Sequence, residues 1–136
     1  MNVTSDHEPA PRPARILLVD DEPSFRVVVE EILRLHGHSV VCAACVSDAL
    51  EAMRRCIPDL ILTDVMMPDI DGLTFIRTIR SSPAWADIPV VVLTARTSLS
   101  DVSEALLAGA STLLTKPFSA SELRKTIAPF MNPVPA

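Results

Sequence analysis

The stretch Asp59-Leu60-Ile61-Leu62-Thr63-Asp64-Val65-Met66-Met67-Pro68 combines a short, continuously apolar run with an acid placed directly at its end. Three further runs also stop at a polar residue: residues 16–19 before Asp20 and Asp21, residues 90–93 before Thr94, and residues 113–115 before Lys116. Continuously apolar strands are typical of parallel sheets covered by helices, and the carboxyl ends of such strands share one edge. The sequence therefore predicts that three carboxylates, a hydroxyl and an ammonium gather in one crevice at that edge.

The first helix is expected to begin near Pro23, because a proline fits the first helical turn, and to end near Gly37. Apolar residues at helical spacing predict its core-facing stripe, which consists of Phe25, Val28, Val29, Ile32 and Leu33. Such stripes are most simply core positions.

The remaining elements follow the same alternation. A second strand is expected at residues 39–43, and a third helix opens around Asp71-Gly72. Two capping patterns open the fourth and fifth helices, and they are Ser98-x-x-Asp101 and Ser119-x-x-Glu122. Five strands alternating with five helices predict an α/β fold, with a parallel sheet, right-handed crossovers and helices on both faces.

The composition suits one globular domain. The chain has 136 residues, of which 49% are apolar and 21% charged. A formal net charge of −5 argues against direct nucleic-acid binding through a broad basic face. No signal peptide is apparent, no apolar run approaches the roughly 20 residues that cross a bilayer, and three cysteines do not suggest a disulfide framework. We therefore expect a cytoplasmic protein without membrane association.

The two ends differ in composition from the middle of the chain. Residues 1–14 carry three prolines among small and charged residues, which predicts a disordered, proline-rich tail. Residues 132–136 are similar and are expected to form a C-terminal tail or a truncated linker. The folded domain is expected to cover residues 15–131.

Five segments resemble the receiver domain of bacterial two-component response regulators. They are Leu17-Leu18-Val19-Asp20-Asp21-Glu22, residues 59–68 quoted above, Asp71-Gly72, Leu93-Thr94-Ala95 and Leu114-Thr115-Lys116-Pro117-Phe118. An acid pair alone would be a weak signal, whereas five segments in the right order are a strong one. The resemblance implies a doubly wound five-stranded parallel sheet in the order 2-1-3-4-5, a flavodoxin-like (βα)5 three-layer sandwich.

The resemblance also implies a role for each matching residue. Asp64 would accept a phosphoryl group and become an acyl phosphate. Thr94 would hydrogen-bond that group, and Lys116 would neutralise one of its oxygens. In the family the peptide bond before the matching proline, here Pro117, is usually cis.

A divalent cation is the implied cofactor. Mg²⁺, with Mn²⁺ as an alternative, would be held by Asp20, Asp21, Asp64 and the backbone carbonyl of Met66. These ligands suit Mg²⁺, which prefers oxygen, keeps several waters and uses few carboxylates together with a phosphate. Neighbouring carboxylates repel one another until a cation or the Lys116 ammonium compensates them.

These roles predict a phosphorylation-activated signalling switch. The donor would be the phosphohistidine of a sensor histidine kinase or of a phosphotransfer protein, or a small phosphodonor. The added charge would draw in Thr94 and Lys116 and repack the surface of the fourth helix, fifth strand and fifth helix. That surface would act on a downstream protein or a covalently linked output domain. Such a chain catalyses its own phosphorylation and dephosphorylation without being primarily a turnover enzyme.

Two other functions stay open. One is a degenerate receiver-like interaction module that phosphorylation does not control, suggested by Leu113, which stands where the family usually has Tyr or Phe. The other is a phosphatase with an aspartyl-phosphate intermediate. Multiple turnover of a phosphate ester would favour the phosphatase, whereas stoichiometric labelling would favour the switch.

The cysteines give a weaker alternative signal. Cys42 and Cys45 lie close in sequence to His36 and His38, a spacing that could suit zinc or redox chemistry. The second strand would place Cys42 so that it does not readily converge with the other three side chains. A buried or structural role for these residues is the simpler interpretation.

Overall fold

The computed structural model describes residues 14–66, 70–95 and 98–131. Apart from Ala14, the two tails predicted at residues 1–14 and 132–136 lie outside these ranges, and so do Met67 and Pro68 of the quoted segment. In the described part no helix is long and apolar enough to cross a membrane.

A five-stranded parallel sheet forms the middle layer, in the predicted order β2-β1-β3-β4-β5. Its strands are β1 Arg15–Val19, β2 Ser39–Ala43, β3 Leu60–Thr63, β4 Val90–Thr94 and β5 Thr112–Thr115. Every residue of the central strands β3 and β4 is buried, because helices cover both faces of the sheet. The continuously apolar runs of the sequence are therefore explained by two-sided burial.

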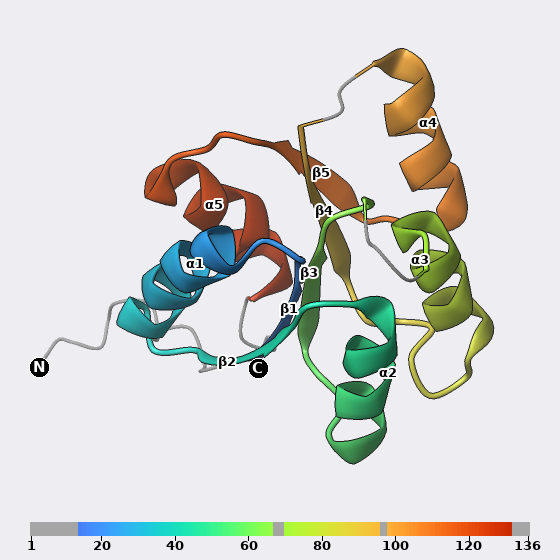
Figure 1. The fold of residues 1–136 in the computed structure, drawn as a ribbon, viewed down its shortest axis with the longest axis horizontal. Helices are drawn as coiled ribbons and strands as arrows, with labels where there is room; N and C mark the ends of the chain where they lie inside the picture. The colour runs from blue at the N-terminus through green and yellow to red at the C-terminus, as the bar shows by residue number, and fades with distance from the viewer. Residues whose placement is uncertain (1–13, 67–69, 96–97, 132–136) are drawn as a thin grey trace, which may run out of the picture.

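Five helices cover the sheet, with α1 and α5 on one face and α2, α3 and α4 on the other (Figure 1). They are α1 Pro23–Leu35, α2 Val46–Arg55, α3 Gly72–Ser81, α4 Leu99–Ala108 and α5 Ala120–Ile127, followed by the short 3₁₀ helix η2 Ala128–Phe130. Successive residues of β1 point to opposite faces of the sheet. Leu17 packs in the core between the sheet and α2, α3 and α4, called here the α2–α4 core. Leu18 packs in the core between the sheet and the pair α1 and α5, called here the α1–α5 core. This three-layer arrangement confirms the predicted fold class.

The predicted helix starts are confirmed, with one difference in chemistry. Ser119 and Glu122 form the full capping box at α5, whereas at α4 the Ser98 hydroxyl donates to the Asp101 carboxylate at 2.7 Å. Asp101 is one methylene shorter than Glu, so its carboxylate pairs with the Ser98 hydroxyl instead of the N-cap backbone. At α3, the Asp71 carboxylate accepts from the backbone of Leu73.

The prediction that Val28 belongs to the buried stripe of α1 was wrong. Val29 and Leu33 are buried, and Phe25 and Ile32 pack against the core that contains them, but Val28 is 57% exposed. Phe25, Val29 and Leu33 follow one another at intervals of four and define the buried line. Val28 lies about 100° away from Val29 around the helix and faces solvent.

Candidate functional site

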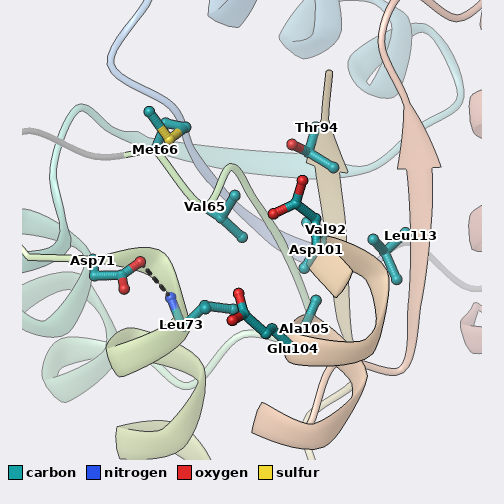
Figure 2. Close-up of a pocket in the computed structure, with 10 residues that line it drawn as sticks. All are labelled: Val65, Met66, Asp71, Leu73, Val92, Thr94, Asp101, Glu104, Ala105 and Leu113. Atoms are coloured by element: carbon teal, nitrogen blue, oxygen red, sulfur yellow. Dashed lines mark hydrogen bonds between the residues drawn. The ribbon is translucent and has the colours of Figure 1, made fainter. Parts of the chain in front are cut away.

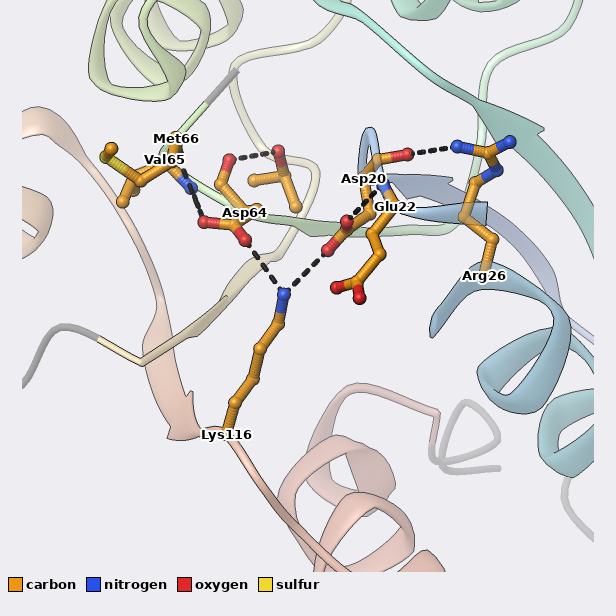
Figure 3. Close-up of polar contacts among 8 residues, drawn as sticks. Asp20, Glu22, Arg26, Asp64, Val65, Met66 and Lys116 are labelled. Carbon is orange, nitrogen blue, oxygen red and sulfur yellow. Dashed lines mark hydrogen bonds and ion pairs between the residues drawn. The ribbon is translucent and has the colours of Figure 1, made fainter. Parts of the chain in front are cut away.

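The site is built around the Lys116 ammonium, which joins two carboxylates from distant parts of the chain (Figure 3). Its Nζ lies 2.8 Å from Asp20 Oδ2 and 2.8 Å from Asp64 Oδ2. The side chains of Asp20 and Asp64 are only 2% and 13% exposed, and that of Lys116 is 17% exposed. The predicted meeting of these acids with the ammonium is therefore present in the structure.

Backbone hydrogen bonds that continue the sheet hold these residues at its carboxyl edge. Asp20 donates its N–H to Ala43 of β2, and Asp64 donates to Val19 of β1. Lys116 donates to the carbonyl of Thr94 at the end of β4. Each site residue thus follows its strand in register, which fixes the direction of its side chain.

The Asp64 carboxylate is held on both sides. Its Oδ2 pairs with Lys116, while Oδ1 accepts from the backbone N–H groups of Val65 at 2.6 Å and Met66 at 3.0 Å. The carboxylate is thereby folded back over the turn that follows β3. Its orientation is set before any ligand arrives.

Asp20 is buried but its carboxylate has partners at both oxygens. Oδ1 accepts from the Glu22 N–H at 2.9 Å, and Oδ2 accepts from Lys116. The guanidinium of Arg26, from α1, donates to the Asp20 carbonyl at 2.6 Å, as Figure 3 shows. Asp21, in contrast, is exposed, and the structure does not bring it into contact with Lys116.

Lys116 also contacts an aromatic ring. Its Nζ lies 4.0 Å from the centroid of the Phe25 ring of α1. The Phe25 ring meets Phe118 edge to face, with centroids 5.7 Å apart and an interplanar angle of 84°. The peptide bond between Lys116 and Pro117 is cis, as the family resemblance led us to expect.

Electrostatics at the site favour the charged amine. Burial alone would lower the pKa of Lys116, but hydrogen bonds to Asp20 and Asp64 outweigh it and raise that pKa above its ordinary value. The ammonium form is therefore stabilised by the two carboxylates that it neutralises.

The alkaline limit of stability is expected to depend on Lys116. A lysine with a raised folded-state pKa stabilises the fold fully below the unfolded pKa of about 10.4, and loses that contribution as the pH rises through the folded pKa. The free energy of unfolding should therefore fall above about pH 10, by about 1.4 kcal/mol for each unit of the raise. Denaturant unfolding at rising pH measures this fall. The chain suits the measurement, because it has no tyrosine and its only other lysine is Lys125.

A second group that titrates at alkaline pH, the Cys42 thiol, also affects the free energy of unfolding in this measurement. Burial, together with a hydrogen bond to Glu30, raises the pKa of the Cys42 thiol to about 11, which causes a loss of the same sign. In a Cys42→Ala background, Lys116→Met should remove the remaining fall, whereas Lys125→Met should keep it. Parallel curves for the two lysine variants would contradict the prediction.

Thr94, the predicted hydroxyl, ends β4 and is 3% exposed. It lines a cavity of about 140 Å³ that lies between the carboxyl edge of the sheet and the helices α3 and α4 (Figure 2). Val65 and Met66, which follow Asp64, line the same cavity, as does Leu113. The cavity therefore connects the turn after the candidate phosphoacceptor with β4 and β5.

The candidate metal ligands are only partly assembled. Oxygen donors are present at Asp20, Asp21, Asp64 and Met66, and this donor set fits the preference of Mg²⁺ for oxygen. Within the described ranges, however, no three His, Cys, Asp or Glu side chains converge closely enough to hold a metal. Lys116 pairs with Oδ2 of Asp20 and Oδ2 of Asp64, so a cation that binds these two oxygens would share them with the ammonium.

The cysteine and histidine residues do not form the alternative centre. Cys42 donates to Glu30, His36 lies 2.8 Å from the Ile32 carbonyl, and the His38 ring accepts from the Ala14 backbone. All three cysteines are free thiols. Within the described residues no three such side chains converge on a metal position, so the zinc interpretation is not supported.

Sequence reasoning missed two residues that contact the site. Phe25 was assigned to the core, and it does pack against the α1–α5 core, but its ring also faces the Lys116 ammonium. Arg26 was not singled out, although it holds the Asp20 carbonyl. Both lie in the first turn of α1, which begins directly after the acid segment, and this is a local signal that could have placed both near the site.

Comparison with known proteins agrees with this arrangement. A model of the response regulator receiver domain matches residues 16–128. The transcriptional regulatory protein TrcR of Mycobacterium tuberculosis (strain ATCC 25618 / H37Rv) is 40% identical over 111 residues, covering 82% of this chain and 42% of that protein. The chemotaxis response regulator CheY4 of Vibrio cholerae has a TM-score of 0.83 at 33% identity, covering 88% of this chain and 99% of that one.

A further solved structure concerns the metal. The receiver domain of the sensor histidine kinase PA1611 from Pseudomonas aeruginosa PAO1, solved with a magnesium ion coordinated in its active site cleft, has a TM-score of 0.81. It is 32% identical, and the match covers 88% of this chain and 98% of that one. The chain spans less than half the length of the curated relatives it matches, 42% of TrcR and 47% of the response regulator MprA of Mycobacterium leprae (strain TN). From its fold, its clustered acids and lysine, and these matches, the chain belongs to the response regulator receiver domain family of two-component systems.

Proposed function

We propose that this chain is a phosphorylation-activated switch whose phosphoacceptor is Asp64. The donor would be the phosphohistidine of a sensor histidine kinase or of a phosphotransfer protein, or a small acyl phosphate. The observation that carries the proposal is the ammonium of Lys116, which lies 2.8 Å from carboxylate oxygens of both Asp64 and Asp20. A nucleophilic carboxylate beside a fixed positive charge is what phosphoryl transfer requires.

The chain's own residues supply the nucleophile and charge compensation. A carboxylate oxygen of Asp64 attacks phosphorus, a new O–P bond forms, and the bond to the leaving group breaks with its electron pair on that group. Asp64 needs no base, because the carboxylate is already anionic. The backbone N–H groups of Val65 and Met66 hold the carboxylate in place, and the Lys116 ammonium keeps its proton and donates to a phosphoryl oxygen.

We propose that Mg²⁺, or Mn²⁺, is held by Asp20, Asp21, Asp64 and the Met66 carbonyl. The support is the set of hard oxygen donors at one edge of the sheet and the burial of the Asp20 charge. Such a cation supplies positive charge to the phosphoryl oxygens. The repulsion between the carboxylates of Asp20 and Asp64 favours this binding, although Lys116 already offsets part of it.

The relay is proposed to run from Thr94 to the surface of α4, β5 and α5. Thr94 lines the cavity beneath α4 and Leu113 of β5 lines it too, so a shift of Thr94 toward a phosphoryl group could repack both elements. The outer side of α4 exposes Leu99 and Leu107, each 86% exposed, which suits a downstream protein or a covalently linked output domain. We also propose that the protein is cytoplasmic and that this chain does not contact nucleic acid directly.

Incubation of the wild-type chain with acetyl phosphate and Mg²⁺, followed by intact-protein mass spectrometry, tests the function. We expect labelling that rises to one phosphoryl group per chain and is removed by hydroxylamine, which cleaves acyl phosphates. Chelation of the cation should slow labelling strongly. Absence of a label would favour an interaction module, and many turnovers of a phosphate ester would favour a phosphatase.

A further inference from the structure

We propose that Phe25 is a positioning residue that holds the Lys116 ammonium at the phosphoacceptor site through the face of its aromatic ring. This inference rests on the proposed function, because the positioned ammonium is the group that would meet the phosphoryl oxygens. It adds an uncharged partner on α1 to the charged side chains of the site.

The geometry around the ammonium supports this role. The Lys116 Nζ donates to Asp20 Oδ2 and Asp64 Oδ2, each at 2.8 Å, and lies over the Phe25 ring at 4.0 Å from its centroid. A cation within about 6 Å of a ring centroid is attracted by the negative face of the ring, more strongly where water is excluded. The Lys116 side chain is 17% exposed, so little water competes with the ring.

The ring itself is held in place. Phe25 and Phe118 meet edge to face at 84°, and both pack against the α1–α5 core that includes Val29 and Leu123. Phe118 follows Lys116 by only two residues, so the same aromatic pair joins α1 to the segment that carries the lysine. The ring therefore has a fixed position relative to the backbone of Lys116.

An aromatic partner differs from a carboxylate in what competes for it. A cation or an incoming phosphoryl group changes the charge at Asp20 and Asp64, and either one weakens their hold on the ammonium. The ring carries no formal charge, so it offers the metal no oxygen ligand and adds no anionic charge beside the phosphoryl group. We infer that Phe25 keeps Lys116 in the site while the carboxylates exchange partners, so that its ammonium can donate to a phosphoryl oxygen as the O–P bond to Asp64 forms.

The contact can be tested first without metal or phosphodonor. The chain has only two lysines, so ¹³C-lysine NMR with a Lys125→Arg variant assigns the ε-methylene signal of Lys116 directly. A ring 4.0 Å from Nζ should shift the ε-methylene protons of Lys116 upfield relative to those of Lys125. Phe25→Leu should remove that shift while keeping an apolar side chain, and an unshifted signal in the wild type would overturn the proposal.

Kinetics then separate positioning from packing. Progressively fluorinated phenylalanines introduced at position 25 keep the shape of the ring but weaken its negative face. The first-order rate constant for acetyl phosphate labelling at saturating Mg²⁺ should fall stepwise, by roughly two- to thirty-fold across the series. Phe130 packs against the same core, and it is the matched control: the same substitutions there should leave the rate unchanged.

The possible outcomes distinguish this inference from the proposed function. A stepwise fall at position 25 only, with unchanged melting temperatures, supports it. Equal rates throughout the series, in a protein that still labels normally, overturn the role of Phe25 and leave the switch intact. A wild-type chain that takes no label overturns both.

Discussion

Asp64→Asn is expected to reduce phosphoryl incorporation from acetyl phosphate to background. The amide is a poor nucleophile and cannot form an acyl phosphate, while its oxygen can still accept from the N–H groups of Val65 and Met66. The turn after β3 should therefore keep its shape. Intact-protein mass spectrometry in the presence of Mg²⁺ measures the loss, which should be complete within the detection limit.

The fold should tolerate this change. Removing one partner of a buried ion pair typically costs about 3–5 kcal/mol, because the other charge is left uncompensated. Here Lys116 retains Asp20 at 2.8 Å, so the loss of unfolding free energy in Asp64→Asn should be smaller than that. Loss of labelling in a variant that melts close to the wild type would then reflect chemistry.

A matched control lies at the opposite end of the same strand. Asp59 directly precedes β3, and its carboxylate accepts from the Arg15 backbone far from the site. Asp59→Asn makes the same chemical change and should label at the wild-type rate. Residual stoichiometric labelling of Asp64→Asn would show that another residue is the phosphoacceptor.

The strands and the carboxyl-edge cluster could be predicted from the sequence because their signals are local. A run such as residues 60–63 is apolar at every position only if both of its faces are buried, and this gives the parallel sheet. The acid that ends it is then placed at the shared edge by topology alone. Asp20, Asp64 and Lys116 met as expected for this reason.

Details that depend on side-chain packing between distant elements could not be predicted. Phe25 occupies a core-facing helical position close to the acid pair, but the sequence does not show that its ring will contact an amine that follows β5. The exposure of Val28 depends on how α1 is rotated against the sheet, which periodicity defines only to within part of a turn. Asp21 is identical in type to Asp20, yet only Asp20 turns inward.

The role of Leu113 shows the same limit. Its departure from the usual aromatic residue is visible in the sequence, but the volume left around it is not. The structure places Leu113 beside a cavity of about 140 Å³ that also touches Thr94. Leucine is smaller than the Tyr or Phe usual at this position, and in this structure it lies beside free space between the site and α4.

Gly72→Ala is expected to damage both stability and phosphorylation. A Cβ at position 72 would lie 2.5 Å from the Val65 Cα and 2.6 Å from the Asp64 carbonyl oxygen, so α3 or the turn after β3 must move. Both contacted atoms belong to the backbone and cannot rotate away. Overpacking of this kind costs about 1–3 kcal/mol, more than the roughly 0.5–1 kcal/mol that alanine gains over glycine inside a helix.

The displaced segment carries Asp64 and the N–H groups that hold its carboxylate, so labelling with acetyl phosphate and Mg²⁺ should slow as well. Gly37→Ala is the matched control. Gly37 has a φ of +88° with nothing within 4 Å of its missing Cβ, and it follows the end of α1 that points away from the site. It should lose about 1–2 kcal/mol through backbone strain and still label normally. Wild-type stability and labelling in Gly72→Ala would show that the turn after β3 can move without affecting the phosphoacceptor.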